Sequence, residues 1–471
     1  MTDNLDFAYR IYYDYQNYLE SSLTNRRVKH SDILPLIDRL REGNIFTVTE
    51  AGKSAEGRDI FLIKAGTGKT KVFLWSQMHG DESTATRALF DIFNFFGSKD
   101  NYDSFKDTLF DKLTIYFMPM VNPDGAEFFK RTNIFDIDIN RDFVRLQTPE
   151  AKVLKDTFNR INAEFGFNLH DQSILYSAGH NFNTATLSFL APAFDVEKSV
   201  NSVREKSMKL IGSMFNAINS FIPGHIAKYP DDFEPRAFGD NFQGLGMSTI
   251  LIESGGWKDD QEKQYIRKLN FIALLIGLKS IAEGSYNDVA LDIYDSIPFN
   301  EKDLMDLVLR NLRYKNNGYE YFVDIGIIRT EINGSLSSAY FVKSSIEEIG
   351  DLSILFGYED LDLMGMEVFP GKTFPTEFSS IEDIKKIDIH SLYADGYTNI
   401  ILCDDNLSEE ITELPINIIT KSKTIGTSIQ VGSPANLIIQ RENKIIYIVL
   451  NGFLYDPFRQ SGSIKNGMIL H

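Results

Sequence analysis

The chain has 471 residues, of which 43% are hydrophobic and 13% aromatic, which is enough to bury a large core and suggests two or three domains. Its formal net charge of -18 at pH 7 argues against nucleic acids and anionic membranes as partners, because clustered Lys and Arg bind both. Cys403 is the only cysteine, which excludes an intramolecular disulfide and a cysteine-rich zinc site.

Targeting signals and membrane spans are not expected from the sequence. The first residues do not combine a basic segment with an apolar one, as a secretory signal would. The longest apolar stretch, residues 271–278, is too short to span a bilayer. We therefore expect a cytoplasmic protein without a membrane partner.

From residue 46 to about residue 285, strand-like runs alternate with helical ones. This alternation predicts an α/β fold with a mixed central sheet flanked by helices. The predicted strands are residues 71–76, 114–119, 165–169 and 248–252. The predicted helices are residues 83–96, 149–161, 197–217 and 259–282.

The pattern changes after residue 285. Residues 300–314 predict one more helix, whereas residues 320–471 consist mainly of short strand-like runs separated by Gly, Asn and Asp. The sequence therefore predicts a catalytic domain over residues 1–285 and a β-rich region over residues 286–471, with room for two small subdomains.

Residues 79–82 place a histidine and a carboxylate three positions apart, between a predicted strand and a predicted helix. Such turns at the carboxyl ends of strands are where α/β proteins bind ligands. Zinc binds imidazole nitrogen and carboxylate oxygen, and a catalytic zinc site keeps three protein ligands. His79 and Glu82 are therefore candidate ligands, although so short a motif also occurs by chance.

A third ligand has to come from another histidine. Only His170 ends an apolar, strand-like segment, residues 165–169, and this places it at the same sheet edge as His79. His180 is the alternative ligand. The alternative to a ligand role is that His170 is a structural histidine at a strand end, with its hydrogen bonds made within the protein.

Glu253 directly follows the predicted strand at residues 248–252. A carboxylate beside a buried strand is costly unless it has a partner. We predict that Glu253 takes the proton of the attacking water and passes it to the leaving amine. The alternative is a salt bridge between Glu253 and a loop cation.

Three further motifs lie between these residues: Asn-Pro-Asp-Gly at residues 122–125, Lys-Arg-Thr-Asn at residues 130–133, and Asp-Ile-Asn-Arg-Asp at residues 138–142. In this order, together with the His-x-x-Glu tetrad, a strand-ending His and a strand-ending Glu, they make the chain similar to the zinc carboxypeptidases, the M14 metallopeptidases. The resemblance covers about residues 52–257. The chain resembles a bacterial-type member of this family that has an extra C-terminal region.

The resemblance implies a role for each matching residue. It implies one Zn2+ ion held by His79, Glu82 and His170, with Glu253 as general base and acid. A planar guanidinium can hold a carboxylate through two hydrogen bonds, which suits selection of a chain end. The remaining implied roles are the grip on the substrate's terminal carboxylate (Asn140, Arg141), polarisation of the scissile carbonyl (Arg131), orientation of the first zinc histidine (Asp138) and a mobile substrate contact (Tyr229).

One position departs from the family pattern, and several others allow more than one role. Asp81 stands where pancreatic members have an arginine, so one substrate contact is missing. Arg131 and Arg141 can also be read as ordinary surface cations. Within residues 234–240, Arg236 would favour an acidic substrate side chain and Asp240 a basic one, and the sequence does not decide between them.

The implied function is that of a zinc-dependent metallocarboxypeptidase, a hydrolase that cleaves the C-terminal peptide bond of a peptide with a free carboxylate. Glu253 would assist the attack of zinc-bound water. The first alternative is a zinc deacylase for small N-acyl amino acids, because desuccinylase-like enzymes share the three ligands and the base. The second is a zinc-binding recognition module without catalysis. The Asp-x-Asn-Arg motif favours the peptidase.

Overall fold

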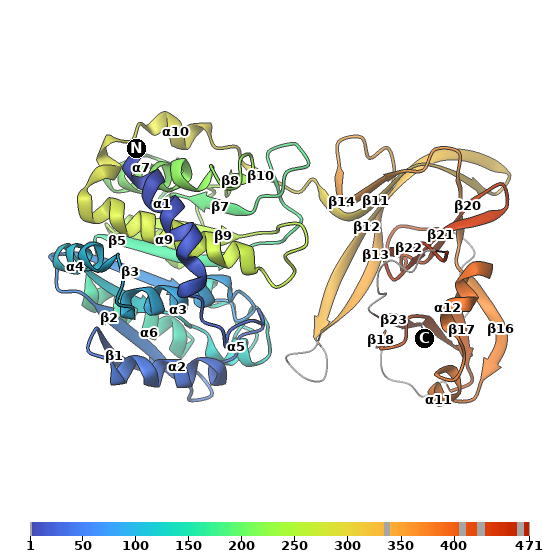
Figure 1. Cartoon of the computed structure of the whole chain (residues 1–471), viewed down its shortest axis with the longest axis horizontal. Helices are drawn as coiled ribbons and strands as arrows, with labels where there is room; N and C mark the ends of the chain where they lie inside the picture. Colours follow the sequence, from blue (N-terminus) through green and yellow to red (C-terminus); the bar gives the residue numbers. More distant parts are fainter. Residues whose placement is uncertain (1, 334–339, 405–410, 422–428, 459–465, 471) are drawn as a thin grey trace. The chain divides into compact units, whose positions relative to one another are not determined.

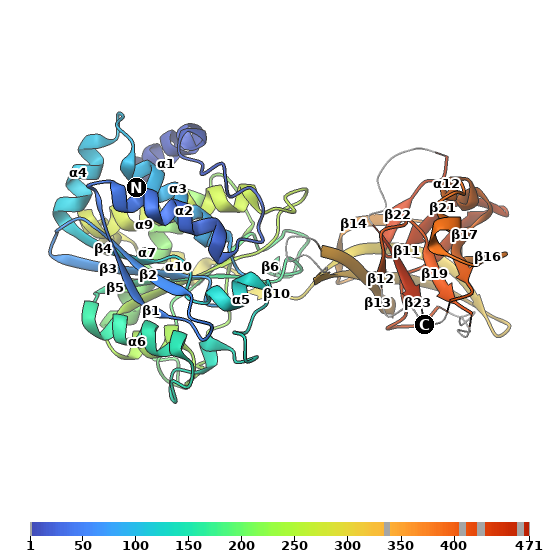
Figure 2. The same ribbon diagram turned by 90° about the horizontal axis from the view of Figure 1, so that it is seen from below.

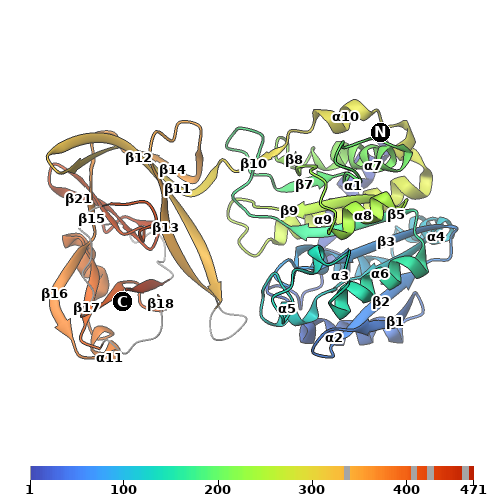
Figure 3. The ribbon, with the colours of Figure 1, turned by 180° about the vertical axis from the view of Figure 1, so that it is seen from behind.

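The computed structural model describes residues 2–333, 340–404, 411–421, 429–458 and 466–470. The chain forms two compact units, Met1–Lys302 and Asp303–His471, which Figures 1, 2 and 3 show from three sides. Among the described residues, none of the helices has the length and apolar content needed to cross a bilayer.

The first unit is built on a mixed eight-stranded sheet with the strand order β1-β2-β4-β3-β5-β9-β7-β8. Strands β4, β3, β5 and β9 run parallel to one another, whereas β1, β2 and β7 each form antiparallel pairs. The predicted α/β fold with a mixed central sheet is thus confirmed. The strands are β1 (Phe46–Lys53), β2 (Asp59–Ala65), β3 (Thr70–Ser76), β4 (Leu113–Met118), β5 (Phe165–Asp171), β7 (Leu187–Leu190), β8 (Ile226–Lys228) and β9 (Ser248–Ser254).

Helices cover both faces of this sheet, and Figure 2 shows α3 and α6 on opposite sides of the strands. The alternation of side chains along β3 explains why both faces are apolar. Val72 and Leu74 pack into one core with α3 and α9, whereas Phe73 and Trp75 pack into the other with α6 and α8. The helices are α1 (Thr2–Asp14), α2 (His30–Glu42), α3 (Thr84–Gly97), α4 (Asp103–Lys112), α5 (Pro123–Glu127), α6 (Pro149–Ile161), α7 (Ser202–Ile218), α8 (Phe238–Gly244), α9 (Gln264–Glu283) and α10 (Leu291–Ser296), with the 3-10 turns η1 (Tyr15–Asn17), η2 (Ile139–Arg141) and η3 (Ser285–Asp288).

Two helices begin later than their sequence patterns predict, because a polar side chain binds the free N–H groups of the first turn. Asn201 accepts hydrogen bonds from the backbone N–H groups of Val203 and Arg204, so α7 starts at residue 202 and not at residue 197. Asp260 accepts hydrogen bonds from the N–H groups of Gln264 and Tyr265. Helix α9 therefore starts at residue 264 and not at residue 259.

The second unit is rich in β-structure, as the sequence predicts. It contains two sheets with separate apolar cores, one around Leu307, Ile327 and Leu437 and the other around Ile400 and Ile418. The larger sheet consists of β11 (Leu304–Asn316), β12 (Tyr319–Asn333), β13 (Tyr340–Gly350), β14 (Phe356–Asp362), β15 (Glu367–Pro370), β20 (Leu437–Arg441), β21 (Lys444–Leu450) and β22 (Phe453–Tyr455). The smaller consists of β16 (Lys372–Phe378), β17 (Tyr397–Leu402), β18 (Ile411–Thr412), β19 (Asn417–Thr420) and β23 (Gly467–Leu470), accompanied by α11 (Ile381–Ile384), α12 (Ile389–Leu392) and the turn η4 (Tyr393–Asp395).

The helix predicted over residues 300–314 is wrong. Residues 300 and 301 form β10 (Asn300–Glu301), which pairs with β6 (Ser177–Ala178) in the first unit. Residues 304–316 form β11, which pairs with β12 on one side and β14 on the other. Leu, Met and Arg are good helix formers, but pairing on both sides buries residues 304–309, and burial in a sheet outweighs local preference.

Candidate metal centre

The parallel strands β3, β5 and β9 bring three polar side chains to one edge of the first unit's sheet. His79 follows β3 after two intervening residues, and His170 lies near the end of β5. Glu253, near the end of β9, pairs in register with His170. Carboxyl ends of parallel strands meet at one edge, and α/β proteins place their ligands there.

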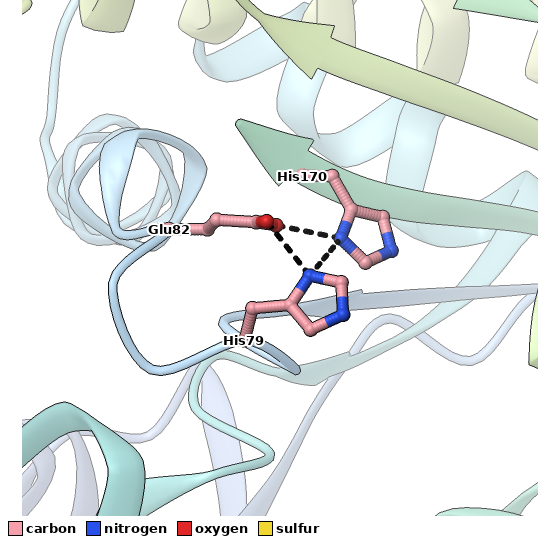
Figure 4. Close-up of side chains that lie close together, drawn as sticks. All are labelled: His79, Glu82 and His170. Atoms are coloured by element: carbon pink, nitrogen blue, oxygen red, sulfur yellow. Dashed lines mark hydrogen bonds and ion pairs between the residues drawn. The ribbon is translucent and has the colours of Figure 1, made fainter. Parts of the chain in front are cut away.

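His79, Glu82 and His170 converge (Figure 4). One ligand atom from each lies within 4.8 Å of the others, and all three residues are buried. Nδ1 of His79 is 2.7 Å from Oε1 of Glu82, and Nδ1 of His170 is 2.7 Å from Oε2 of the same carboxylate. The two Nδ1 atoms are 3.2 Å apart.

The distance between the two imidazole nitrogens fits a tetrahedral metal site, whereas the two 2.7 Å contacts to Glu82 have the length of hydrogen bonds. Bonds of about 2.0 Å from zinc to nitrogen correspond to ligand-to-ligand distances of about 3.3 Å, close to the observed 3.2 Å between the two Nδ1 atoms. Nε2 of His79 donates to Oδ1 of Asp138 over 3.1 Å, which leaves the Nδ1 lone pair directed at the centre of the cluster. The three residues could therefore hold a metal ion.

Arg131 lies beside the cluster and joins two of its carboxylates. Its Nε and Nη2 atoms contact Oδ2 of Asp138 at 3.1 and 3.0 Å, and its Nη1 donates to Glu82 over 3.3 Å. The Arg131 side chain keeps 48% of its surface exposed. A half-exposed guanidinium next to the candidate ligands can still bind an oxygen from solution.

Buried charges determine the proton affinities in this cluster. Burial lowers the pKa of His79, but the charge of Glu82 and the hydrogen bond to Asp138 outweigh it and raise the pKa to about 9. Burial lowers the pKa of His170. Burial, with the neighbouring charge of Glu82 second, raises the pKa of Glu253 well above its usual range. Burial thus favours the protonated form of the Glu253 carboxyl group.

Glu253 is separate from the three convergent side chains. It keeps 8% of its surface exposed, and within the described residues its carboxylate makes neither a hydrogen bond nor an ion pair. The alternative of a salt bridge to a loop cation therefore has no support among these residues. A buried carboxylate without a partner is costly and is typical of a functional site.

Asn140 and Arg141 lie on η2, directly after Asp138. The side-chain oxygen of Asn140 accepts a hydrogen bond from the backbone N–H of Phe238. Arg141 keeps 37% of its side chain exposed, and its Nε lies 3.2 Å from Oε2 of Glu234. The arginine expected to bind a substrate carboxylate is thus paired with a carboxylate of the chain.

Tyr229 and His180, the two other residues predicted for the site, are not among the three convergent side chains. Tyr229 follows β8, and its backbone N–H donates to the carbonyl of Phe189. Its pKa is raised by burial and then by the charge of Glu253. His180, the alternative ligand, does not join the cluster: its side chain is 78% exposed and lies 3.7 Å from Glu301.

The Asn-Pro-Asp-Gly motif fixes the loop that carries His79. Asp124 is fully buried and accepts hydrogen bonds from the hydroxyl of Ser54 (2.7 Å), the backbone N–H of Glu56 (2.9 Å) and the guanidinium of Arg58 (2.6 Å). The motif thus attaches α5 to the turn after β1. Gly80 lies directly against this helix, because a Cβ there would stand 2.1 Å from the backbone carbon of Gly125.

Gly80→Ala is expected to destabilise the first unit by about 1–3 kcal/mol, the usual cost of inserting a methyl group into a packed site. The obstructing atoms are backbone, so no rotamer change relieves the clash, and residues 79–82 must shift. Thermal unfolding followed by circular dichroism would measure the loss. Gly97→Ala is the matched control, because a Cβ at Gly97 meets nothing within 4 Å. Equal melting temperatures for the two variants would contradict the expectation.

Two residues near the site, Glu234 and Asp171, are not among those predicted from the sequence. The pairing of Glu234 with Arg141 joins segments far apart in the chain. Asp171, which follows His170 directly and could have been noticed for that reason, accepts from Thr84 over 2.6 Å and from Lys263 over 3.1 Å. Asp171 thus braces β5 against the start of α3.

The chain is similar to known carboxypeptidases over part of its length. A family model described as zinc carboxypeptidase matches residues 33–229, a range that contains His79, Glu82 and His170. Carboxypeptidase 2 of Trichophyton tonsurans is 25% identical over 152 residues, which cover 31% of this chain and 27% of that protein. Carboxypeptidase SOL1 of Arabidopsis thaliana is 24% identical over 140 residues, which cover 26% of this chain and 28% of that protein. The chain thus spans about a quarter of the length of these relatives.

Among solved structures, a metallo-carboxypeptidase from Burkholderia cenocepacia aligns with 54% of this chain and 69% of its own, at 16% sequence identity and a TM-score of 0.44. What these comparisons show is a similarity over part of the chain, in which residues 33–229 match the zinc carboxypeptidase family model.

Proposed function

We propose that the protein is a zinc-dependent metallocarboxypeptidase that hydrolyses the C-terminal peptide bond of a peptide. One observation carries the proposal: two imidazoles and a carboxylate converge within 4.8 Å. Glu253, which has no hydrogen-bond or ion-pair partner among the residues that the structure describes, pairs in register with His170 on the next strand. The match of residues 33–229 to the zinc carboxypeptidase family model supports the same function.

One zinc ion is the proposed cofactor, with His79, Glu82 and His170 as its ligands. Zinc bound there would supply a Lewis acid for the scissile carbonyl and a water that loses its proton near neutral pH. Asp138 would hold His79 in the tautomer that directs Nδ1 to the metal, through the hydrogen bond to Nε2.

Glu253 is the proposed general base and acid. Its burial and raised pKa suit a carboxylate that accepts a proton from the attacking water and releases it to the leaving amine. Arg131 is the proposed ligand for the carbonyl oxygen, because its guanidinium is half exposed beside the cluster and can donate to a developing negative charge.

Arg141 and Asn140 are the proposed binding site for the substrate's terminal carboxylate. A guanidinium binds a carboxylate through two charge-assisted hydrogen bonds, and a site of this kind rejects a chain that continues past the scissile bond. Tyr229, which directly follows β8 (Ile226–Lys228), is a further proposed substrate contact, as the family resemblance implies.

Arg141→Gln is expected to raise KM for a peptide with a free carboxylate by about 10–100-fold, the value of a hydrogen bond to a charged group, with little change in kcat. Steady-state kinetics on one peptide and its C-terminal amide would measure the effect, and the amide should not respond. Arg145→Gln removes an exposed arginine four positions on and serves as the control. An unchanged KM in Arg141→Gln would show that the carboxylate is bound elsewhere.

The general test is a hydrolysis assay on a peptide library, on the same peptides amidated at the C-terminus, and on N-succinyl amino acids. Mass spectrometry would identify the released residue. We expect single C-terminal residues from the free peptides alone. Cleavage of N-succinyl amino acids only would favour the deacylase, and no cleavage by the zinc-loaded protein would favour a recognition module.

A further inference from the structure

The guanidinium of Arg141 already has a carboxylate partner within the chain. Oε2 of Glu234 lies 3.2 Å from Nε of Arg141, and Nη1 of Arg141 donates to the carbonyl of Asn140 over 2.8 Å. Both side chains are partly accessible, with 37% of Arg141 and 28% of Glu234 exposed. The pair is therefore in contact with solvent and can exchange partners.

Backbone contacts hold Glu234 at this position. Its own N–H donates to Oδ1 of Asp240 over 3.0 Å. The segment after Glu234 is joined to the turn after η2, because the N–H of Phe143 donates to the carbonyl of Arg236 over 3.2 Å. Glu234 is thus held next to Arg141 by the hydrogen bond from its N–H to the side chain of Asp240, as well as by charge.

A second arginine competes for the same carboxylate. The backbone N–H and Nε of Arg236 donate to Oε1 of Glu234 over 3.1 and 2.9 Å, and Nη2 donates to Oε2 over 2.9 Å. Hydrogen bonds from Arg236 and the charge of Arg141 lower the pKa of Glu234. Glu234 is therefore a carboxylate anion shared between two guanidinium groups.

We propose that Glu234 is a specificity-determining residue, whose carboxylate competes with the terminal carboxylate of a substrate for Arg141. This inference rests on the proposed function. A ligand carboxylate that binds Arg141 must displace the Oε2 contact, and Arg236 then retains the released Glu234 through its three remaining hydrogen bonds. The site therefore binds a terminal carboxylate less tightly than a free Arg141 would.

Kinetics on a peptide substrate give the first test. Glu234→Gln keeps the shape of the side chain and removes its charge, so KM should fall by about two- to fivefold, the range measured for partly exposed ion pairs, with kcat unchanged. Arg236→Gln should raise KM, because Glu234 then has Arg141 as its main partner. The double variant should behave like Glu234→Gln, since Arg236 acts only through Glu234.

Ligand binding gives a second test that does not depend on hydrolysis. Titration of N-benzoylglycine, and of its amide as control, into the zinc-loaded full-length chain can be followed by ligand-observed NMR. Tighter binding of the carboxylate to Glu234→Gln, with the amide unaffected, is the expected result. Equal affinity in Glu234→Gln and the unchanged protein would overturn the inference, and so would a loss in Arg236→Gln that persists in the double variant.

Failure of the proposed role of Glu234 and failure of the proposed function give different experimental results. If the unchanged protein removes C-terminal residues but Glu234→Gln shows no gain, the inference about Glu234 is wrong and the proposed function stands. If the unchanged protein cleaves no peptide and N-benzoylglycine binds none of the variants, the proposed function fails and the inference fails with it.

Discussion

Glu253→Gln is expected to lower kcat for peptide hydrolysis by about 10²–10⁴-fold, the usual contribution of a general base. Glutamine has nearly the same shape but cannot accept the proton of an attacking water. Because Glu253 is not one of the three convergent residues, zinc content should stay the same. Single-turnover kinetics together with metal analysis of the purified variant would separate the two effects.

Glu164→Gln provides the control for Glu253→Gln. Glu164 precedes β5 and is exposed, so the same chemical change there should leave kcat unaltered. If Glu253→Gln retained the activity of the unchanged protein, the base would have to be another group. If it lost zinc and activity together, Glu253 would be supporting the metal site and its role as a base would be unproven.

Removal of zinc by a chelator is expected to abolish hydrolysis and to lower the melting temperature of the first unit. A ligand present at 100 to 1,000 times its Kd stabilises the folded state by about 3–4 kcal/mol, and this stabilisation disappears with the metal. The fold itself should persist, because both imidazoles can still hydrogen-bond to Glu82. Far-ultraviolet circular dichroism should therefore change little, while adding zinc should restore activity.

Glu82→Gln tests whether the added metal acts at the proposed ligands. Zinc should neither raise the melting temperature of this variant nor restore its activity, because a neutral amide is a poor zinc ligand. An equal thermal shift in Glu82→Gln and the unchanged protein would place the metal elsewhere. Full activity in metal-free protein would remove the basis for a zinc hydrolase.

The part of the site that the sequence could predict is the part built on strands. His170 and Glu253 each end an apolar run, and parallel strands align their carboxyl ends. From those facts alone both residues are expected at one sheet edge, and the structure has them paired in register. Their roles as ligand and base stay predictions, since those depend on chemistry and not on position.

Contacts between distant loops could not be predicted. The Glu234 and Arg141 pair depends on how the segment before α8 meets η2, and no spacing rule relates the two positions. The segment 304–316 shows the same limit in the second unit. Its composition suits a helix, and only its pairing with β12 and β14 makes it a strand.

The distribution of the convergent side chains along the chain has a consequence for folding. His79 and His170 are 91 positions apart, and they meet only after β3 and β5 have paired. A nascent or truncated chain that ends before β5 holds at most two of the three donors. Metal capture should therefore be a late event that reports completed assembly of the sheet, and the incorporated ion would slow the reverse process by linking its central strands.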